Sequence, residues 1–461
     1  MNLTKLLHLA GAGGLVLAMS LFGSGANARE QPAIAGIFRS SILINNPAAA
    51  DANVSVMLVN ADGARAMAAP VMFKVAGSSS TQLYLPNLAG LSDGRYSAVV
   101  DSDKPVAVIV NMTSDSPATS TSYNGIPLDA VGRTFNMPQA YKNYHGFTSS
   151  LILQNSGAAF ANALISYRTG AGQVAAEGRS IAPNASVTVD QGSVAALPQG
   201  FVGSAVVTAD QDIGAVFLVS AAGQLSSGRG ATSGSPIAYA PVIYDEYFGF
   251  VTNVFVQNLD TTTTNVTIEY FDSRTGASVG SEQAWILPGT SVTFYQFDTG
   301  RGLAVPRHNF NGSAVIRSTD NKNIIAITNI NHPGLGYLEA YNAFPSSGAT
   351  QRASCPAIMK NYHNYNTSLT VQNVGTVPTN LTIQYIGPGG AVASQIMISG
   401  LKPNATAFRY NPSPADGLPV GFLGAAVVTS SASPIVAVVN EQLGAGTELG
   451  DQLFTYSCSN N

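Results

Sequence analysis

The sequence predicts an all-β protein made of four tandem antiparallel β-sandwich domains that follow a signal peptide. Three observations support this fold class. A strand-forming phrase recurs along the chain, the recurring segments alternate apolar and polar residues, and Gly, Pro, Asn, Asp and Ser interrupt them at short intervals. No part of the mature chain sustains the i, i+3, i+4, i+7 spacing of an amphipathic helix.

The repeat is clearest in "GFVGSAVVTA", which begins at Gly200, and "GFLGAAVVTS", which begins at Gly421. A second recurring feature is a strand that ends in an amide pair, in the strings "SSILINN", "TSSLILQN", "VTNVFVQN" and "NTSLTVQN". Neither feature carries a charged residue, a cysteine or a histidine, so both indicate architecture rather than chemistry. The period is roughly 105 to 115 residues, which is the size of one sandwich domain.

The strand type is evident in "TNVTIEY", where Val266, Ile268 and Tyr270 fall on one side and the residues between them on the other. This period of two is typical of a half-buried strand. We therefore predict a signal peptide over residues 1–28 and repeats over residues 29–131, 132–240, 241–352 and 353–461, the first repeat being the most divergent.

The N-terminus has the layout of a secretory signal. Lys5 precedes an apolar stretch that ends in Ala26-Asn27-Ala28, so we expect cleavage before Arg29 and an exported, secreted protein. A permanent membrane anchor is the alternative, disfavoured because glycines interrupt the apolar run. No later segment offers the roughly 18 consecutive apolar residues of a spanning helix, so we expect no membrane-spanning segment in the mature chain.

The content of charged residues limits the classes of partner that the protein is expected to bind. Charged residues make up 10% of the chain, well below the roughly 25% of typical globular proteins. The formal net charge of -4 leaves no basic footprint and argues against nucleic acid. A surface of this kind suits neutral partners, among them sugars and copies of the protein itself.

The two cysteines lie near the start and the end of the fourth repeat. In an exported protein, Cys355 and Cys458 are expected to form a disulfide that joins the first strand of this domain to its last. A metal pair or a catalytic thiol is the alternative, and His363 is the one histidine near either cysteine in sequence.

No catalytic constellation stands out. The stretch Gly90–Gly94 matches G-x-S-x-G, but a strand rather than a helix follows it. The histidines lack the spacing of a zinc hydrolase, and the paired aspartates of the hairpins are explained by turn formation as well as by calcium. We therefore expect no enzyme activity, no cofactor and no metal.

The richest polar and aromatic clusters occur where repeats two to four begin, in "YKNYHGF", "YDEYFGF" and "KNYHNY". Such tyrosines can stack on sugar rings, or they can cover apolar surface at the seam between consecutive domains. The candidate ligand or interdomain patch consists of Tyr141, Tyr144, His145, Tyr244, Tyr247, Phe248, Tyr362, His363 and Tyr365.

The recurring strings "TSLxVQN", "GFxGSAVV" and "PIxAVVN" resemble tandem Ig-like β-sandwich repeat proteins of bacterial cell surfaces, over residues 30–460. The resemblance implies a non-catalytic structural or adhesive protein of the cell surface. We expect a rod, filament or surface-layer component that contacts itself, as a homo-oligomer or filament, or other surface proteins. The alternative is an array of carbohydrate-binding modules that uses the aromatic clusters.

Overall fold

The computed structural model describes residues 15–22, 37–115, 118–296, 309–444 and 450–460. It confirms the all-β class, because every pair of neighbouring strands is antiparallel in this part of the chain. The helices described are short 3-10 turns, namely η1 (Leu85–Asn87), η2 (Leu128–Ala130), η3 (Gln191–Ser193), η4 (Ser346–Gly348) and η5 (Pro414–Asp416). Within the same ranges, no helix is long and apolar enough to cross a membrane.

The strands group into four units, of which units 1, 3 and 4 each have two sheets and unit 2 has one continuous sheet. Unit 1 contains β1 (Leu15–Phe22), β2 (Phe38–Asn45), β3 (Ala52–Asn60), β4 (Val71–Val75), β5 (Ser80–Tyr84), β6 (Arg95–Ser102), β7 (Ala107–Asp115), β8 (Ala118–Asn124) and β9 (Ile126–Pro127). Unit 2 contains β10 (Gly132–Lys142), β11 (Thr148–Asn155), β12 (Ala161–Thr169), β13 (Gly172–Ile181), β14 (Ser186–Asp190), β15 (Phe201–Ala221) and β16 (Gln224–Arg229).

Units 3 and 4 repeat the same order. Unit 3 contains β17 (Ile237–Asp245), β18 (Val251–Asn258), β19 (Thr264–Asp272), β20 (Ser278–Ile286), β21 (Ser291–Tyr295), β22 (Phe310–Ser318), β23 (Ile324–His332), β24 (Tyr337–Asn342) and β25 (Phe344–Pro345). Unit 4 contains β26 (Arg352–Lys360), β27 (Tyr365–Asn373), β28 (Thr379–Ile386), β29 (Val392–Leu401), β30 (Thr406–Tyr410), β31 (Phe422–Ser430), β32 (Ile435–Leu443), β33 (Leu453–Ser457) and β34 (Ser459–Asn460).

Units 1, 3 and 4 share one topology. In unit 1 the sheets run β4-β3-β6-β1-β9 and β5-β2-β7-β8, and units 3 and 4 follow the same pattern. The first strand pairs with the sixth, an order distinct from immunoglobulin constant domains, whose sheets are ABED and CFG. In unit 2 the sixth and seventh strands are fused into the 21-residue β15, which joins the two sheets.

The first strand of every unit carries an irregularity at the same place. The pairing register shifts between Ala18 and Leu21 in β1, between Met137 and Ala140 in β10, between Ala240 and Ile243 in β17, and between Cys355 and Ile358 in β26. Such bulges bend a strand locally and are built features of a fold rather than defects. β1 is therefore the counterpart of β10, β17 and β26.

This assignment gives the N-terminal segment a second role. Residues 15–22 lie inside the segment predicted to be a signal peptide, yet they form β1 and fill the place between β6 and β9. The predicted cleavage before Arg29 stays a prediction, and residue 29 lies outside the described residues. If cleavage occurs there, β6 loses this neighbour.

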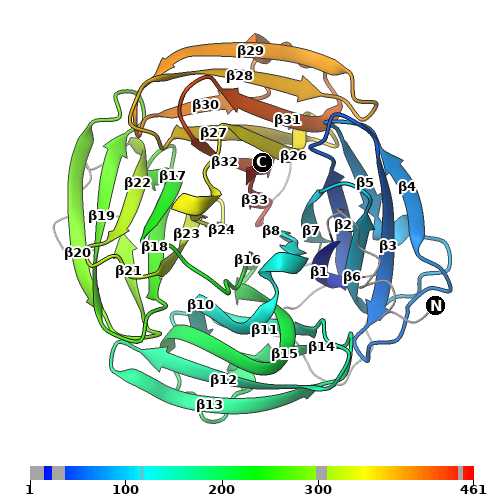
Figure 1. Cartoon of the computed structure of the whole chain (residues 1–461), viewed down its shortest axis with the longest axis vertical. Helices are drawn as coiled ribbons and strands as arrows, with labels where there is room; N and C mark the ends of the chain where they lie inside the picture. The colour runs from blue at the N-terminus through cyan, green and yellow to red at the C-terminus, as the bar shows by residue number, and fades with distance from the viewer. Residues whose placement is uncertain (1–14, 23–36, 116–117, 297–308, 445–449, 461) are drawn as a thin grey trace.

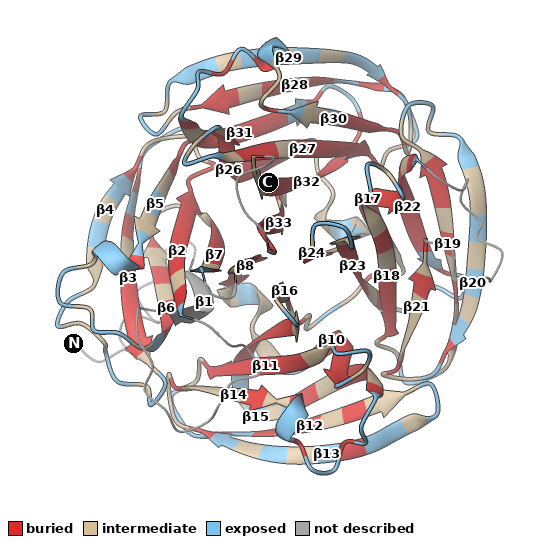
Figure 2. Ribbon diagram, turned by 180° about the vertical axis from the view of Figure 1, so that it is seen from behind, coloured by how far each residue is buried: buried red, intermediate tan, exposed pale blue. Residues whose placement is uncertain are grey.

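The four units surround a common axis and form a closed ring (Figure 1). The last strands of the second sheets, β8, β16, β24 and β33, meet at the centre, while β4, β13, β20 and β29 lie at the periphery and alternate exposed with less exposed residues (Figure 2). The expectation of an extended rod is therefore wrong. The repeats bend back on one another because each contributes a strand to a shared centre.

Equivalent loop contacts close the ring at four seams. Ser186 N–H donates to Ala61 O between units 1 and 2, Ser204 Oγ donates to Gly289 O between units 2 and 3, Thr406 N–H donates to Ser273 O between units 3 and 4, and Ser79 Oγ donates to Pro388 O between units 4 and 1. At each seam, corresponding loops and strand ends of two successive units contact each other. Head-to-tail contacts of this type form a ring when the rotation between neighbours closes.

The amide that ends the second strand explains one sequence signature. Asn155 Nδ2 donates to Ala159 O and Ile181 O, at 2.7 and 2.9 Å, and Asn155 Oδ1 accepts from Gly157 N–H. Asn46, Asn258 and Asn373 make the equivalent bonds in the other units. A buried side-chain amide therefore fixes the loop after this strand in every repeat, which is why the asparagine recurs.

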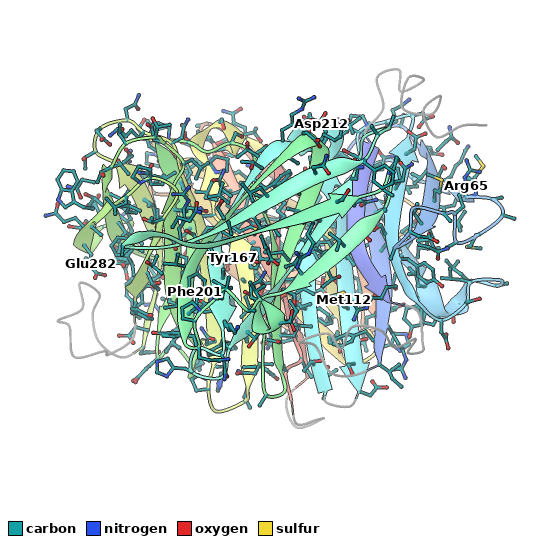
Figure 3. The ribbon with its side chains drawn as sticks, turned by 90° about the horizontal axis from the view of Figure 1, so that it is seen from below. Arg65, Met112, Tyr167, Phe201, Asp212 and Glu282 are labelled. Carbon is teal, nitrogen blue, oxygen red and sulfur yellow. A yellow bond between two sulfur atoms is a disulfide. The ribbon has the colours of Figure 1, made fainter. Side chains whose placement is uncertain are left out.

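The strands run between the two faces of the ring, and the core of each unit continues into the next unit, as where Ile152 and Val216 of unit 2 join the core of unit 1. Figure 3 shows unit 2 from the side, with Phe201 toward one face and Asp212 toward the other. Tyr167 and Phe201 meet edge to face in this core, with ring centroids 6.1 Å apart. The Tyr167 hydroxyl donates to Glu177 Oε1, so the buried phenol keeps a polar partner.

Candidate functional site

The aromatic clusters of the sequence form three equivalent hairpin turns, which we call the tip turns: Tyr144–Phe147, Tyr247–Phe250 and Tyr362–Tyr365. In each, the first and fourth residues exchange two backbone hydrogen bonds. Both central residues have positive φ: 49° and 86° at His145 and Gly146, 50° and 84° at Phe248 and Gly249. This is the pattern of a type I′ turn, which favours Asn-Gly.

The residues of the predicted patch separate into three layers. Tyr141 and Tyr244 are buried, whereas Tyr144, Tyr247, Tyr362 and Tyr365 are half-buried and His145, Phe248 and His363 are exposed. Phe248 exposes 77% of its surface. Each exposed ring packs edge-on against the half-buried tyrosine before it, with centroids 4.4, 4.7 and 4.5 Å apart.

The buried layer takes part in packing between units. The ring of Tyr141 in unit 2 meets Phe255 of unit 3 edge to face, with centroids 6.1 Å apart. Burial raises the pKa of the Tyr141 hydroxyl well above its usual value, and burial likewise raises the pKa of Tyr244. The inner tyrosines therefore belong to the cores and seams, and the exposed rings remain as the accessible part of the patch.

The three tip turns project from the same face of the ring. Leu225 N–H of unit 2 and Leu338 N–H of unit 3 both donate to the carboxyl group of Asp451 in unit 4, so equivalent strand positions meet at one level. The units therefore have the same polarity along the axis. The segment of unit 1 that corresponds to a tip turn lies outside the described residues.

The axis holds a carboxyl group that sequence reasoning missed. Glu339 of β24 is fully buried. Its Oε1 accepts from Ser122 N–H at 2.6 Å and from Thr455 N–H at 3.4 Å, and Thr121 Oγ1 lies 3.0 Å from both carboxyl oxygens. One side chain of unit 3 therefore binds units 1 and 4. The sequence feature that could have indicated this residue is a single acidic side chain within the otherwise uncharged strand "YLEAYN".

Two more acids are buried where units meet. Asp451 is fully buried, and Glu441 Oε2 of unit 4 accepts from Asn111 Nδ2 of unit 1 at 2.9 Å. Burial raises the pKa of Glu339 and of Asp451 well above the usual range, and the charge of Asp451 adds to the effect at Glu339. Burial also raises the pKa of Glu441 to about 8. The axis therefore favours neutral carboxyl groups, which act as connectors between units.

The predicted disulfide is present between Cys355 of β26 and Cys458, just after β33. It joins the first strand of unit 4 to the end of the chain, across 103 residues of sequence. Among the residues that the structure describes, no three His, Cys, Asp or Glu side chains gather closely enough to hold a metal ion.

No protein-family model matches the chain, and no curated protein is similar to it. Among solved structures, it is similar to Thermotoga maritima 1070, with 16% identity over 25% of this chain and 95% of that chain, at a TM-score of 0.20. It is also similar to Anabaena sensory rhodopsin transducer, with 16% identity over 22% of this chain and 87% of that chain, at a TM-score of 0.17. A third likeness is the tetra-tandem repeat in the extending region of a large adhesion protein, with 13% identity over 97% and 98% of the chains, at a TM-score of 0.12.

Proposed function

We propose that the protein is an exported, non-catalytic surface protein that adheres through its tip turns to other copies of itself. The observation that carries the proposal is the display of His145, Phe248 and His363 from one face of a closed ring. Three equivalent contacts on one rigid support give avidity without a strong individual contact. This self-adhesion is one form of the structural or adhesive function that the repeats led us to expect.

The backbone supports a functional reading of these rings. A bulky residue at positive φ costs of order 1–3 kcal/mol, and such residues persist mainly where function needs them. Phe248 has φ of 50° where asparagine would fit best, and its ring is exposed rather than packed in a core. The Phe248 ring packs on Tyr247 of the same turn and otherwise presents its surface to solvent.

The experiment replaces all three exposed rings with the residue that the turn prefers: His145→Asn, Phe248→Asn and His363→Asn together. Because asparagine suits a type I′ turn, the variant is expected to fold at least as stably as the parent. Sedimentation velocity over a concentration series should give an association constant at least tenfold lower for the variant. Equal self-association of the two proteins would overturn the proposal, as would a parent protein that remains monomeric.

A matched control removes three exposed apolar side chains elsewhere. Met72, Trp285 and Met397 are exposed on the peripheral strands β4, β20 and β29, and their joint substitution by threonine leaves the tip turns intact. We expect this variant to associate as the parent does. Loss of association here would indicate general hydrophobic contact instead of a tip-turn contact.

A second candidate function is carbohydrate binding, which the neighbourhood of the turn in unit 2 favours. Asn143 Nδ2 lies 3.4 Å from Gln199 Oε1 beside the exposed ring of His145, so amides and an aromatic ring share one surface. A glycan array probed with the parent and the triple asparagine variant separates the two functions. Glycan signals that the asparagine variant loses, from a protein that stays monomeric, would favour this second function.

A further inference from the structure

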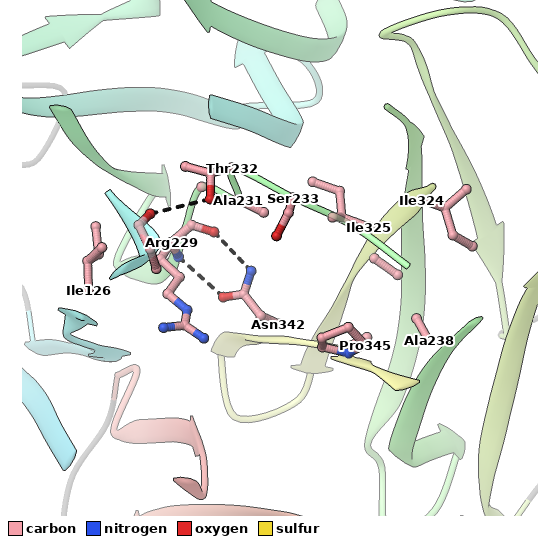
Figure 4. A pocket seen from close by; sticks show the side chains of 15 residues that line it. Ile126, Arg229, Ala231, Thr232, Ser233, Ala238, Ile324, Ile325, Asn342 and Pro345 are labelled. Carbon is pink, nitrogen blue, oxygen red and sulfur yellow. Dashed lines mark hydrogen bonds between the residues drawn. The ribbon is translucent and has the colours of Figure 1, made fainter. Parts of the chain in front are cut away.

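A cavity lies where three units meet, near the end of the axis opposite the tip turns. It has a volume of about 160 Å³. Ile126 and Ala130 line it from unit 1, Arg229 and the segment 230–234 from unit 2 and the linker after it, and Ile324 and Pro345 from unit 3 (Figure 4). The lining is mostly apolar, with one cationic side chain.

The backbone N–H and C=O of Arg229 both bond to Asn342 of unit 3. The Arg229 side chain takes no part in this contact. Arg229 N–H donates to Asn342 Oδ1 at 3.3 Å, and Asn342 Nδ2 donates to Arg229 O at 2.9 Å (Figure 4). Asn124 and Ser457 make the same pair of bonds between units 1 and 4. Arg229 therefore occupies the position at which the other units have asparagine or serine. Its side chain is longer than theirs, so the guanidinium lies beyond this pair of backbone hydrogen bonds.

The guanidinium has almost no protein partner. Its Nη1 donates to Gly125 O at 3.4 Å. The ion pairs formed by arginines in the described part of the chain involve Arg39, Arg133, Arg179 and Arg409, and none involves Arg229. A guanidinium offers five N–H donors, and Arg229 is half-buried at the cavity wall, so the donors that lack a protein acceptor are available to a ligand. Burial lowers the pKa of Arg229, and the more distant charge of Asp129 opposes this only in part.

We propose that this cavity binds a small organic carboxylate, whose oxygens pair with the guanidinium of Arg229 while a short hydrocarbon part lies against Ile126 and Ala130. The planar fork of arginine matches a carboxylate with two parallel hydrogen bonds. The apolar walls favour a hydrocarbon group over a fully hydrated anion such as inorganic phosphate. The volume, below the roughly 300 Å³ of drug-sized pockets, limits the ligand to a few carbon atoms.

The test titrates the full chain with sodium propionate, with sodium chloride at matched ionic strength as the reference and calorimetry as the readout. We expect saturable binding of propionate, at least tenfold weaker binding of inorganic phosphate, and at least tenfold weaker propionate binding after Arg229→Met. Arg133→Gln is the matched control, because Arg133 is an exposed arginine, and it should leave binding unchanged.

A second variant keeps the charge and fills the cavity. Ala130 is half-buried at the wall, so Ala130→Leu should weaken propionate binding while Arg229 remains. This variant keeps the proposal falsifiable if Arg229→Met folds poorly. Absence of propionate binding up to about 50 mM, well above a millimolar dissociation constant, would overturn the proposal. Equal affinities of the parent and Arg229→Met, or of phosphate and propionate, would overturn it too.

Discussion

The backbone N–H of Ser122 in unit 1 donates a hydrogen bond of 2.6 Å to the carboxyl group of Glu339 in unit 3, across 217 residues of sequence. The two residues belong to units that are not neighbours along the chain. Because Thr455 of unit 4 donates to the same oxygen, this carboxyl group fixes the relative positions of three units.

Replacing Glu339 with alanine should therefore destabilise the ring as a whole. The N–H groups of Ser122 and Ala340 lose their acceptor in a buried place, and we expect the free energy of unfolding to fall by at least about 2 kcal/mol. Denaturant unfolding measures the change. Glu269→Ala, at a partly exposed position of the same unit, is the control and should stay within about 0.5 kcal/mol of the parent. Equal losses in the two variants would contradict the connecting role.

Glu441 should make stability depend on pH. Its pKa is raised to about 8 by burial, above the usual 4.5 of the unfolded chain. The folded state therefore holds a proton that the unfolded state releases, so this contribution is complete below pH 4.5 and is lost as the pH rises from 4.5 to about 8. Denaturation midpoints between pH 5 and 9 should fall with rising pH.

Glu441→Gln tests the origin of that pH dependence. The amide removes the titrating group and keeps a partner for Asn111, so the slope between pH 5 and 8 should become shallower and the variant should exceed the parent in stability at pH 9. Glu269→Gln should leave the slope as it is in the parent. An unchanged slope in Glu441→Gln would mean that other groups cause the dependence.

Gly276 at the seam between units 3 and 4 should not accept a side chain. Its φ is 65°, and a Cβ there would lie 2.0 Å from Pro403 O. Gly276→Ala adds a steric conflict with the next unit to the cost of positive φ, so we expect a loss of more than about 2 kcal/mol and faster amide exchange at Thr406. Thermal unfolding and hydrogen exchange measure both effects.

Gly172 provides the matched control, because it occupies the same turn of unit 2. Its φ is 106°, and no atom lies within 4 Å of an added Cβ. Gly172→Ala therefore reports the backbone cost alone, about 1–2 kcal/mol. If the two alanine variants lose the same stability, close contact at the seam does not limit side-chain size.

The N-terminal segment gives the fourth prediction. A chain that begins at Arg29 lacks β1, and the register pairs Val16, Leu17 and Ala18 with β6 residues 98–100. We expect faster amide exchange over residues 98–101 and lower stability than in the full chain, because the strand loses its neighbour. Sequencing the N-terminus of the protein isolated from cells decides which form exists. Unchanged exchange would mean that another segment takes the place of β1.

The candidate site was only partly predictable. The sequence indicated the aromatic clusters, since His145 and His363 fall at equivalent repeat positions, with Phe248 between them. It could not separate the exposed rings from the buried Tyr141 and Tyr244, because burial here depends on the neighbouring unit. Glu339, Asp451 and Arg229 carried no motif, and their roles follow from residues more than a hundred positions away.

The sequence by itself determined the all-β class, the recurring asparagine and the disulfide of the last unit. These depend on local alternation, on a bond from Asn155 to a residue four positions later, and on two cysteines at the ends of one repeat. The tertiary structure decided that the repeats close into a ring. Closure depends on the angle between successive units, which contacts such as that between Ser79 and Pro388, 309 residues apart, fix. Alternation within a strand holds no information about that angle, since the pattern is the same in a straight array and in a closed one.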